Sequence, residues 1–198
     1  MHFAPTKFDK AWLIKPERHE DERGFFARTW CQREFEEHGL DADLVQCNVS
    51  FNKTKGTVRG MHFQTAPHEE VKLVRCTRGR VFDVIVDVRP RSTTFGESFG
   101  AELSAENGVA IYVPAGFAHG FQTLEDDCEL FYQISCEHHA ESARGIHYAD
   151  SEVRIDWPLP ASIVSDKDTR LPTVRELICE PYEPPRCPGV PKKMEAVR

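Results

Sequence analysis

Two histidines end glycine-containing segments and could carry acid–base or metal chemistry. His62 ends the segment GTVRGMH, and His119 ends the segment GVAIYVPAGFAH. In the second segment, Pro114 and Gly116 predict a turn between two strands, which would bring His119 to the mouth of a β-barrel. An imidazole held there can exchange a proton near neutral pH or bind a metal ion. The alternative is an ordinary turn that carries a surface histidine.

The same two segments resemble the two conserved motifs of the cupin superfamily, whose fold is a double-stranded β-helix or jelly roll. Metal-binding cupins place a second histidine two residues after the first, and here that position is Gln64. Glu69 stands near the place of the usual acidic ligand, in a stretch typical of a loop. His62 and His119 alone do not supply the three protein ligands that zinc or iron usually needs. We therefore expect no metal and no other cofactor; a metal-dependent cupin enzyme is the alternative.

Seven segments, spread in order over residues 5–172, resemble the dTDP-4-dehydrorhamnose 3,5-epimerase family. They are DERGFFARTW, VQCNVSFNKTKGTVRGMHFQ, VKLVRCTRGRVFDVIVDVRPRSTTFG, VPAGFAHGFQTL, ELFY, RGIHYAD and IDWP followed by SDKD. The resemblance implies that the protein converts a nucleotide-linked 4-keto-6-deoxy sugar, dTDP-4-dehydro-6-deoxyglucose, to dTDP-4-dehydrorhamnose by inverting C3, C5 or both. A non-catalytic module that binds a sugar nucleotide is an alternative from another class.

Such a reaction removes a proton beside a carbonyl and returns one from the opposite face, so it needs a base, an acid and a stabiliser of the enolate oxygen. The resemblance implies His62 as the base and Asp168 as the carboxylate that fixes its tautomer. It implies Tyr132 as the acid and Lys72 as the group that meets the keto oxygen. Lys72 stands alone between apolar residues, where a buried ammonium would need an anion. Each residue also has a purely structural alternative. Asp168 could be a surface turn residue, Tyr132 a buried strand tyrosine and Lys72 an outward lysine on an edge strand.

The resemblance also implies a set of groups that bind the nucleotide sugar. Arginine suits a diphosphate because its planar guanidinium can bind two oxygens at once. Strict alternation along a strand would put Arg59 and His62 on opposite faces, so we expect Gly60 to break the alternation, for example as a bulge. The implied substrate-binding residues are Arg23, Phe26, Arg28, Gln46, Asn48, Arg59, His119, His138 and Lys167.

Four positions differ from the usual pattern of the family. His138 stands in place of a tyrosine that stacks on thymine, and Ala143 stands in place of a glutamate. Arg28 replaces an acidic residue, and Gln133 replaces a frequent lysine. All four belong to the binding side, and none belongs to the implied catalytic set. We therefore expect the chemistry to be retained, while the nucleotide and the sugar stay open.

Short strand-like segments separated by turns predict an all-β fold, a cupin-like jelly roll with few short helices. The clearest strand is 80–88, RVFDVIVDV, in which Asp83 shares a face with Val81 and Ile85. A helix is expected over 31–38, ended by Gly39. The other expected strands are 11–15, 24–29, 44–51, 57–64, 71–77, 98–103, 109–113, 119–124, 129–135 and 153–157.

Length and composition fit one folded domain with a tail. The chain has 198 residues, of which 40% are hydrophobic and 29% charged, so enough apolar surface exists for a core. We expect a single domain over 1–180. Prolines crowd the segment PYEPPRCPGVPK, which excludes a helix or a central strand and predicts a tail over 181–198.

Charge, hydropathy and cysteine content limit the classes of partner and the compartment that we expect. The net charge of −7 argues against non-specific nucleic-acid binding, and no apolar run is long enough for a membrane span. The N-terminal residues lack the apolar stretch of a secretory signal. Seven cysteines, with no CxxC pair, favour reduced thiols in the cytoplasm. The family resemblance implies a homodimer whose N-terminal strands complete the partner's sheet.

Overall fold

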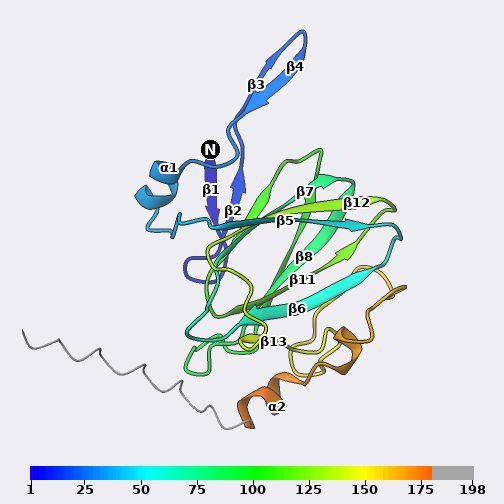
Figure 1. Cartoon of the computed structure of the whole chain (residues 1–198). Helices are drawn as coiled ribbons and strands as arrows, with labels where there is room; N and C mark the ends of the chain where they lie inside the picture. The colour runs from blue at the N-terminus through cyan, green and yellow to red at the C-terminus, as the bar shows by residue number, and fades with distance from the viewer. Residues whose placement is uncertain (180–198) are drawn as a thin grey trace, which may run out of the picture.

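The strands predicted from alternating apolar residues form two antiparallel sheets that pack face to face in a jelly roll (Figure 1). This computed structural model describes residues 1–179. In spatial order, the six-stranded sheet consists of β1 (His2–Pro5), β2 (Trp12–Lys15), β10 (Ala110–Val113), β7 (Lys72–Arg78), β12 (Cys128–Ile134) and β5 (Gln46–Asn52). The five-stranded sheet consists of β13 (Ala143–Gly145), β6 (Val58–Gln64), β11 (Phe117–Thr123), β8 (Arg80–Asp87) and β9 (Ser98–Ser104).

Apolar side chains from both sheets meet in the space between them. Val74, Ile111 and Leu130 come from the six-stranded sheet, while Val81 and Ile85 come from β8 of the five-stranded sheet. All five are almost completely buried, so this cluster is the main core of the fold. The alternation predicted for 80–88 is confirmed, because successive residues of β8 point to this core and to the opposite face.

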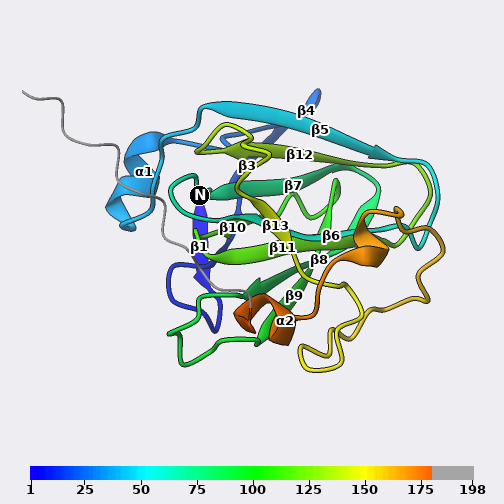
Figure 2. The ribbon, with the colours of Figure 1, turned by 60° about the horizontal axis from the view of Figure 1, so that its bottom comes forward.

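The outer face of the five-stranded sheet is covered by the chain that follows β13 (Figure 2). Val84 and Val86 of β8 pack there with Ile146 and Val153. A strand was expected over 153–157, and that prediction is wrong, because this segment pairs with no strand. Its apolar residues cover the sheet as an irregular segment, so their spacing reflects packing and not strand pairing.

The predicted helix is α1 (Gln32–Glu37), which packs on the outer face of the six-stranded sheet. It ends where the glycine signal predicts. Gly39 has φ +68°, its N–H donates to the carbonyl of Glu36, and the N–H of Leu40 donates to the carbonyl of Phe35. These two bonds satisfy carbonyls that the helix end would leave free. Phe35 is buried and anchors the helix to the sheet.

The short elements at the two ends of the described chain were not predicted. They are β1, β3 (Arg18–Asp21), β13, the 3-10 helix η1 (Asp168–Arg170) and α2 (Val174–Cys179). β3 forms a hairpin with β4 (Gly24–Ala27), which lies within the strand expected over 24–29. The proline-rich tail predicted over 181–198 lies outside the described residues, and it stays a prediction together with the single domain over 1–180. No helix within residues 1–179 is long and apolar enough to cross a membrane.

Candidate active site

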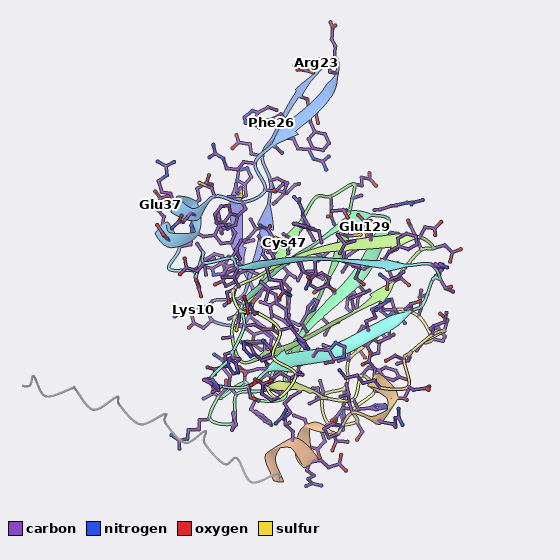
Figure 3. All side chains as sticks on the ribbon, viewed as in Figure 1. Lys10, Arg23, Phe26, Glu37, Cys47 and Glu129 are labelled. Atoms are coloured by element: carbon purple, nitrogen blue, oxygen red, sulfur yellow. The ribbon has the colours of Figure 1, made fainter. Side chains whose placement is uncertain are left out.

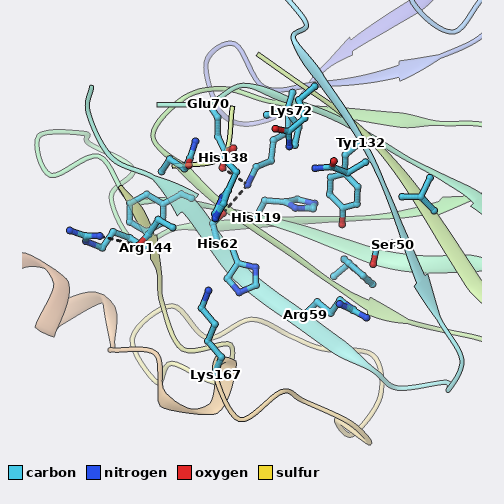
Figure 4. Close-up of a pocket in the computed structure, with 18 of the residues that line it drawn as sticks. Ser50, Arg59, His62, Glu70, Lys72, His119, Tyr132, His138, Arg144 and Lys167 are labelled. Atoms are coloured by element: carbon cyan, nitrogen blue, oxygen red, sulfur yellow. Dashed lines mark hydrogen bonds and ion pairs between the residues drawn. The ribbon is translucent and has the colours of Figure 1, made fainter. Parts of the chain in front are cut away.

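A cavity of about 370 Å³ lies at one end of the sandwich and receives side chains from both sheets (Figure 4). The six-stranded sheet contributes residues of β5, β7 and β12, and the five-stranded sheet contributes residues of β6, β11 and β13. Ionisable and amide groups dominate the lining, which suits a polar ligand. The sequence-predicted residues that line it are Gln46, Asn48, Arg59, His62, Lys72, His119, Tyr132, His138 and Lys167.

His62 and Asp168 form a close pair at the edge of this cavity. The Nε2 atom of His62 lies 2.7 Å from Oδ1 of Asp168, whose side chain is almost completely buried. Burial alone would raise the pKa of Asp168. The hydrogen bond and the charge of His62, with N–H donation from Gly60, outweigh that effect, so the pKa lies below its ordinary value. Asp168 is therefore an ionised partner of the imidazole at neutral pH.

A bulge in β6 brings Arg59 and His62 to the same cavity. His62 pairs with His119 of β11, but Arg59 pairs with Phe121, so β6 carries one extra residue in this interval. Gly60 lies there with φ +133°, and a Cβ on it would come within 2.6 Å of the Gly120 Cα atom. The expectation that Gly60 breaks the alternation is thus confirmed, and only glycine fits at this position.

Lys72 points into the cavity and not outward from an edge strand. Its side chain is 9% exposed, and its ammonium lies 2.9 Å from a carboxylate oxygen of Glu70 and 3.1 Å from the carbonyl oxygen of His62. Glu70 is the anion that a buried ammonium requires. The positive charge is consequently held inside the cavity, between Glu70 and the backbone of His62 (Figure 4).

A second histidine–aspartate pair lies deeper between the sheets. Nε2 of His119 lies 3.0 and 2.9 Å from the two carboxylate oxygens of Asp83, which is completely buried. The ring of Tyr132 meets the imidazole of His119 edge to face at 5.8 Å. Burial and the negative charge of Asp83 raise the pKa of Tyr132 well above 10, against a smaller opposing effect of Arg59. Tyr132 is therefore a neutral phenol that can donate a proton.

Comparison with known proteins identifies the family of this chain. Residues 5–176 match the family model described as dTDP-4-dehydrorhamnose 3,5-epimerase. The chain belongs to the dTDP-4-dehydrorhamnose 3,5-epimerase family. A curated enzyme of that name from Sinorhizobium fredii is 43% identical over 178 residues, which are 89% of this chain and 91% of the relative.

Solved structures of such epimerases have the same fold. The enzyme from Elizabethkingia anophelis superposes with a TM-score of 0.86 at 40% identity, over 89% of this chain and 97% of that one. A dTDP-6-deoxy-D-glucose-3,5-epimerase from Legionella pneumophila, in complex with dTDP-4-keto-L-rhamnose, has a TM-score of 0.83 at 38% identity. That match covers 88% of this chain and 93% of the Legionella chain.

Three of the binding residues implied by the epimerase resemblance lie outside the cavity of the single chain. Arg23 and Phe26 are on the β3–β4 hairpin, which projects away from both sheets (Figure 3). Phe26 is 76% exposed, and the side chain of Arg23 contacts Asp21 of the same hairpin. Arg28 forms an ion pair with Glu34 of α1. Their roles at an epimerase site stay predictions.

The cavity also holds residues that sequence reasoning missed. Asp83, Glu70 and Arg144 stand at or behind its wall, the first as the partner of His119 and the second as the partner of Lys72. For Asp83 a signal was present, because it shares the core face of a strand with apolar residues, where a carboxylate needs a partner. Glu70 and Arg144 lie in or next to loops, and their sequence positions carry no such signal.

Proposed function

We propose that this chain is a metal-independent isomerase that epimerises a nucleotide-linked 4-keto-6-deoxy sugar at C3, C5 or both. Its substrate is dTDP-4-dehydro-6-deoxyglucose and its product dTDP-4-dehydrorhamnose. The observation that carries the proposal is one cavity with His62, paired with Asp168, on one sheet and a neutral tyrosine, Tyr132, on the other. The name of the Sinorhizobium relative and the ligand of the Legionella structure both contain this product, dTDP-4-dehydrorhamnose or dTDP-4-keto-L-rhamnose.

His62 is the base that removes the proton next to the keto group. The carboxylate of Asp168 holds the imidazole in one orientation and stabilises the imidazolium that forms when the proton arrives. Metal chemistry is not needed at this position. Nε2 of His62 is engaged by Asp168, and Gln64, at the place of a second cupin ligand, uses its amide to bond the backbone of His68, Glu137 and His139.

Removal of the proton leaves an enolate whose negative charge lies mainly on the former keto oxygen. Lys72 offers an ammonium held close to His62, so it can stabilise this charge without first moving there. His119, fixed by Asp83, lines the same cavity and is the second donor that we assign to this oxygen. Both groups sit in a largely buried place, where a charge–charge attraction is stronger than in water.

Tyr132 returns the proton from the opposite side. His62 lies on β6 of one sheet and Tyr132 on β12 of the other, so a sugar ring bound between the sheets exposes one face to each (Figure 4). The raised pKa of Tyr132 keeps its hydroxyl protonated throughout the neutral range. Because C3 and C5 both flank C4, one base and one acid serve either carbon if the ring turns.

The nucleotide part is bound by cationic and amide side chains around the cavity mouth. Arg59, whose Nε donates to Asn52, and Lys167 offer positive charge for the diphosphate. Gln46 and Asn48 of β5 offer amide donors and acceptors, and His138 offers a flat ring.

A homodimer completes the site. The outer face of the six-stranded sheet carries a row of neighbouring side chains, Val49, Phe131 and Arg75, of which Val49 is 60% exposed. Within the described residues, the buried Nε of Arg75 has no hydrogen-bond partner, and the hairpin of Arg23 and Phe26 covers no part of its own chain's cavity. A second copy packed on this face accounts for both features and delivers the hairpin to the partner's cavity.

Complementation between two defective chains tests the homodimer. His62→Asn and Arg23→Ala should each inactivate homodimers, yet the two chains expressed together should form heterodimers with one intact site. Because half of the randomly paired dimers are mixed, about a quarter of the wild-type activity should return. Absence of any recovery, or a single-chain mass by light scattering at micromolar concentration, would contradict the shared site.

We also place the protein in the cytoplasm, where nucleotide sugars are handled in the presence of reduced thiols. In support, Cys31, Cys47, Cys76, Cys128 and Cys136 are all free thiols. Counting reactive thiols in the denatured protein, isolated without reductant from its native cells, checks this placement. Disulfide-bonded cysteines in that preparation would argue for an oxidising compartment.

The proposed reaction is tested by incubating the protein with dTDP-4-dehydro-6-deoxyglucose in deuterated water and following the sugar by NMR. Deuterium should enter at C3, C5 or both, with inversion at the labelled carbon, and a panel of other nucleotides identifies the preferred carrier. His62→Asn is the matched control, and its exchange should fall about 10²–10⁴-fold. Wild-type protein that binds the sugar and never exchanges a proton would be a binding module and not an epimerase.

A further inference from the structure

Outside the cavity, His68, His139 and Glu141 gather at one place on the surface. His68 lies in the turn after β6, and the other two lie in the loop between β12 and β13. The atoms that these side chains can offer to a metal lie within 4.8 Å of one another. The two imidazole rings are stacked, with centroids 3.5 Å apart and planes inclined by 9°. None of the three lines the cavity assigned to the sugar nucleotide.

The backbone under this cluster is fixed by a buried side chain. Gln64, 3% exposed, accepts a hydrogen bond of 2.6 Å from the backbone N–H of His139 and donates one of 3.0 Å to the carbonyl of His68. The N–H of Thr65 also donates to the carbonyl of Ser142, 2.9 Å away. The two histidine-bearing segments are therefore held side by side independently of any contact between the rings.

The hydrogen bonds of the rings leave one nitrogen of each histidine available. Nδ1 of His68 lies 2.8 Å from the hydroxyl of Ser142, and Nδ1 of His139 lies 3.2 Å from the carboxylate of Glu141. Metal-binding histidines commonly use one nitrogen for the ion and the other for a partner such as Ser142. Glu141 would leave its contact with His139 and turn its carboxylate to the ion. An ion bound here would take an unprotonated nitrogen from each ring.

We propose that His68, His139 and Glu141 bind one divalent cation of the zinc class. Two imidazoles and a carboxylate suit such borderline ions better than they suit Ca²⁺ or Mg²⁺. In a tetrahedral zinc site, metal–ligand bonds of about 2.0–2.1 Å place neighbouring ligand atoms about 3.4 Å apart. The ligand atoms here lie up to 4.8 Å apart, so the longest distance between them must shorten by roughly 1.5 Å. The stacked rings must also splay. Both movements are open to side chains at the surface, where the Glu141 side chain is 69% exposed.

The bound ion would act on the rim of the cavity and not in the reaction. His138, next to His139, lines the cavity, and so does Arg144, three residues after Glu141. A cation that joins His68 to the β12–β13 loop would hold this part of the rim to the turn after β6. The site is separate from His62 and Tyr132, so a negative result for metal binding would not contradict the proposed epimerase chemistry, and the reverse also holds.

Metal titration of the full chain, after chelator treatment and buffer exchange, tests the site. Calorimetry with Zn²⁺ should give one ion per chain for the wild type. His68→Gln and His139→Gln should each weaken binding by at least about tenfold. His2→Gln, which removes another exposed histidine, should leave binding unchanged.

Two measurements keep the result unambiguous. Co²⁺ replacing Zn²⁺ should give a spectrum of nitrogen and oxygen ligands; intense thiolate charge-transfer bands would assign the ion to cysteines and overturn the proposal. His68→Gln should keep the wild-type circular dichroism spectrum, which shows that lost binding is not lost folding. Wild-type protein that binds no Zn²⁺ when the metal is in excess, or variants that bind as the wild type does, would equally overturn it.

Discussion

Replacing Asp168 by asparagine removes the charge behind the proposed base while keeping the shape of the side chain. Asp168 lies in η1, is almost completely buried and contacts Nε2 of His62 at 2.7 Å. Its lowered pKa means that the wild-type group is a carboxylate at every pH at which the enzyme would work. The asparagine amide can still form a hydrogen bond with the imidazole, but it cannot stabilise a positive imidazolium.

The expected size of the effect follows from the charge pair. Two unit charges about 4 Å apart attract each other by about 4 kcal/mol at an effective dielectric constant near 20. The side chain of His62 is 42% exposed, so water screens part of this attraction. A loss of about 3 kcal/mol in the transition state then corresponds to a rate about 10²-fold lower.

The assay is the initial rate of deuterium entry into dTDP-4-dehydro-6-deoxyglucose, measured by NMR at neutral pH. Asp166→Asn is the matched control, because Asp166 lies two residues away on the exposed side of the same segment. The control should keep the wild-type rate, and both variants should keep the wild-type circular dichroism spectrum. If Asp168→Asn exchanged as fast as the control, the carboxylate would have no part in activating His62.

Three further changes probe other parts of the site and the fold. Lys72→Met should lower deuterium exchange and inversion together by about 10²–10³-fold, because no enolate forms without its counter-charge; full exchange in this variant would contradict the role of Lys72. Gly60→Ala should lower the free energy of unfolding by at least about 2 kcal/mol in urea, because its Cβ meets the backbone of β11, whereas Gly96→Ala, also at positive φ but in open space, should cost less. Asp87→Asn should lower the free energy of unfolding at pH 7 by about 1–2 kcal/mol. Burial acts to raise the pKa of Asp87, but hydrogen bonds, first among them that of Arg89, lower it to about 2, so the folded protein favours the ionised carboxylate. Since that pKa is depressed, the contribution is full above about pH 4 and disappears as the pH falls towards 2, so the acid unfolding curves of the two proteins should converge there; a constant difference would contradict the assignment.

Much of the fold and of the site could be predicted from local patterns. Alternation in 80–88 identified β8, and Gly39 identified the end of α1. Gly60 had to break the alternation if Arg59 and His62 were to share a pocket, and the bulge in β6 does so. These inferences succeed because each depends on residues close in sequence, whose backbone geometry a glycine or a period of two restricts.

The features that were missed depend on contacts between distant parts of the chain. The segment 153–157 has the apolar residues of a strand, yet it covers a sheet without pairing, and no local pattern separates the two outcomes. The partner of Lys72 is Glu70 and that of His119 is Asp83, and such pairing is decided by tertiary packing. The place of Phe26 depends on a second chain in the proposed dimer, which no single-chain pattern specifies.

The central claim is that a base on one sheet and an acid on the other act on opposite faces of the sugar. Tyr132→Phe tests it most directly, because phenylalanine keeps the ring against His119 and removes one hydroxyl. Deuterium exchange and inversion are measured on the same sample of dTDP-4-dehydro-6-deoxyglucose in deuterated water. The variant should still exchange, since His62 can return a proton to the face it came from, while inversion falls about 10²–10⁴-fold. Inversion at the wild-type rate would contradict the account, because the returning proton would then come from water or another residue.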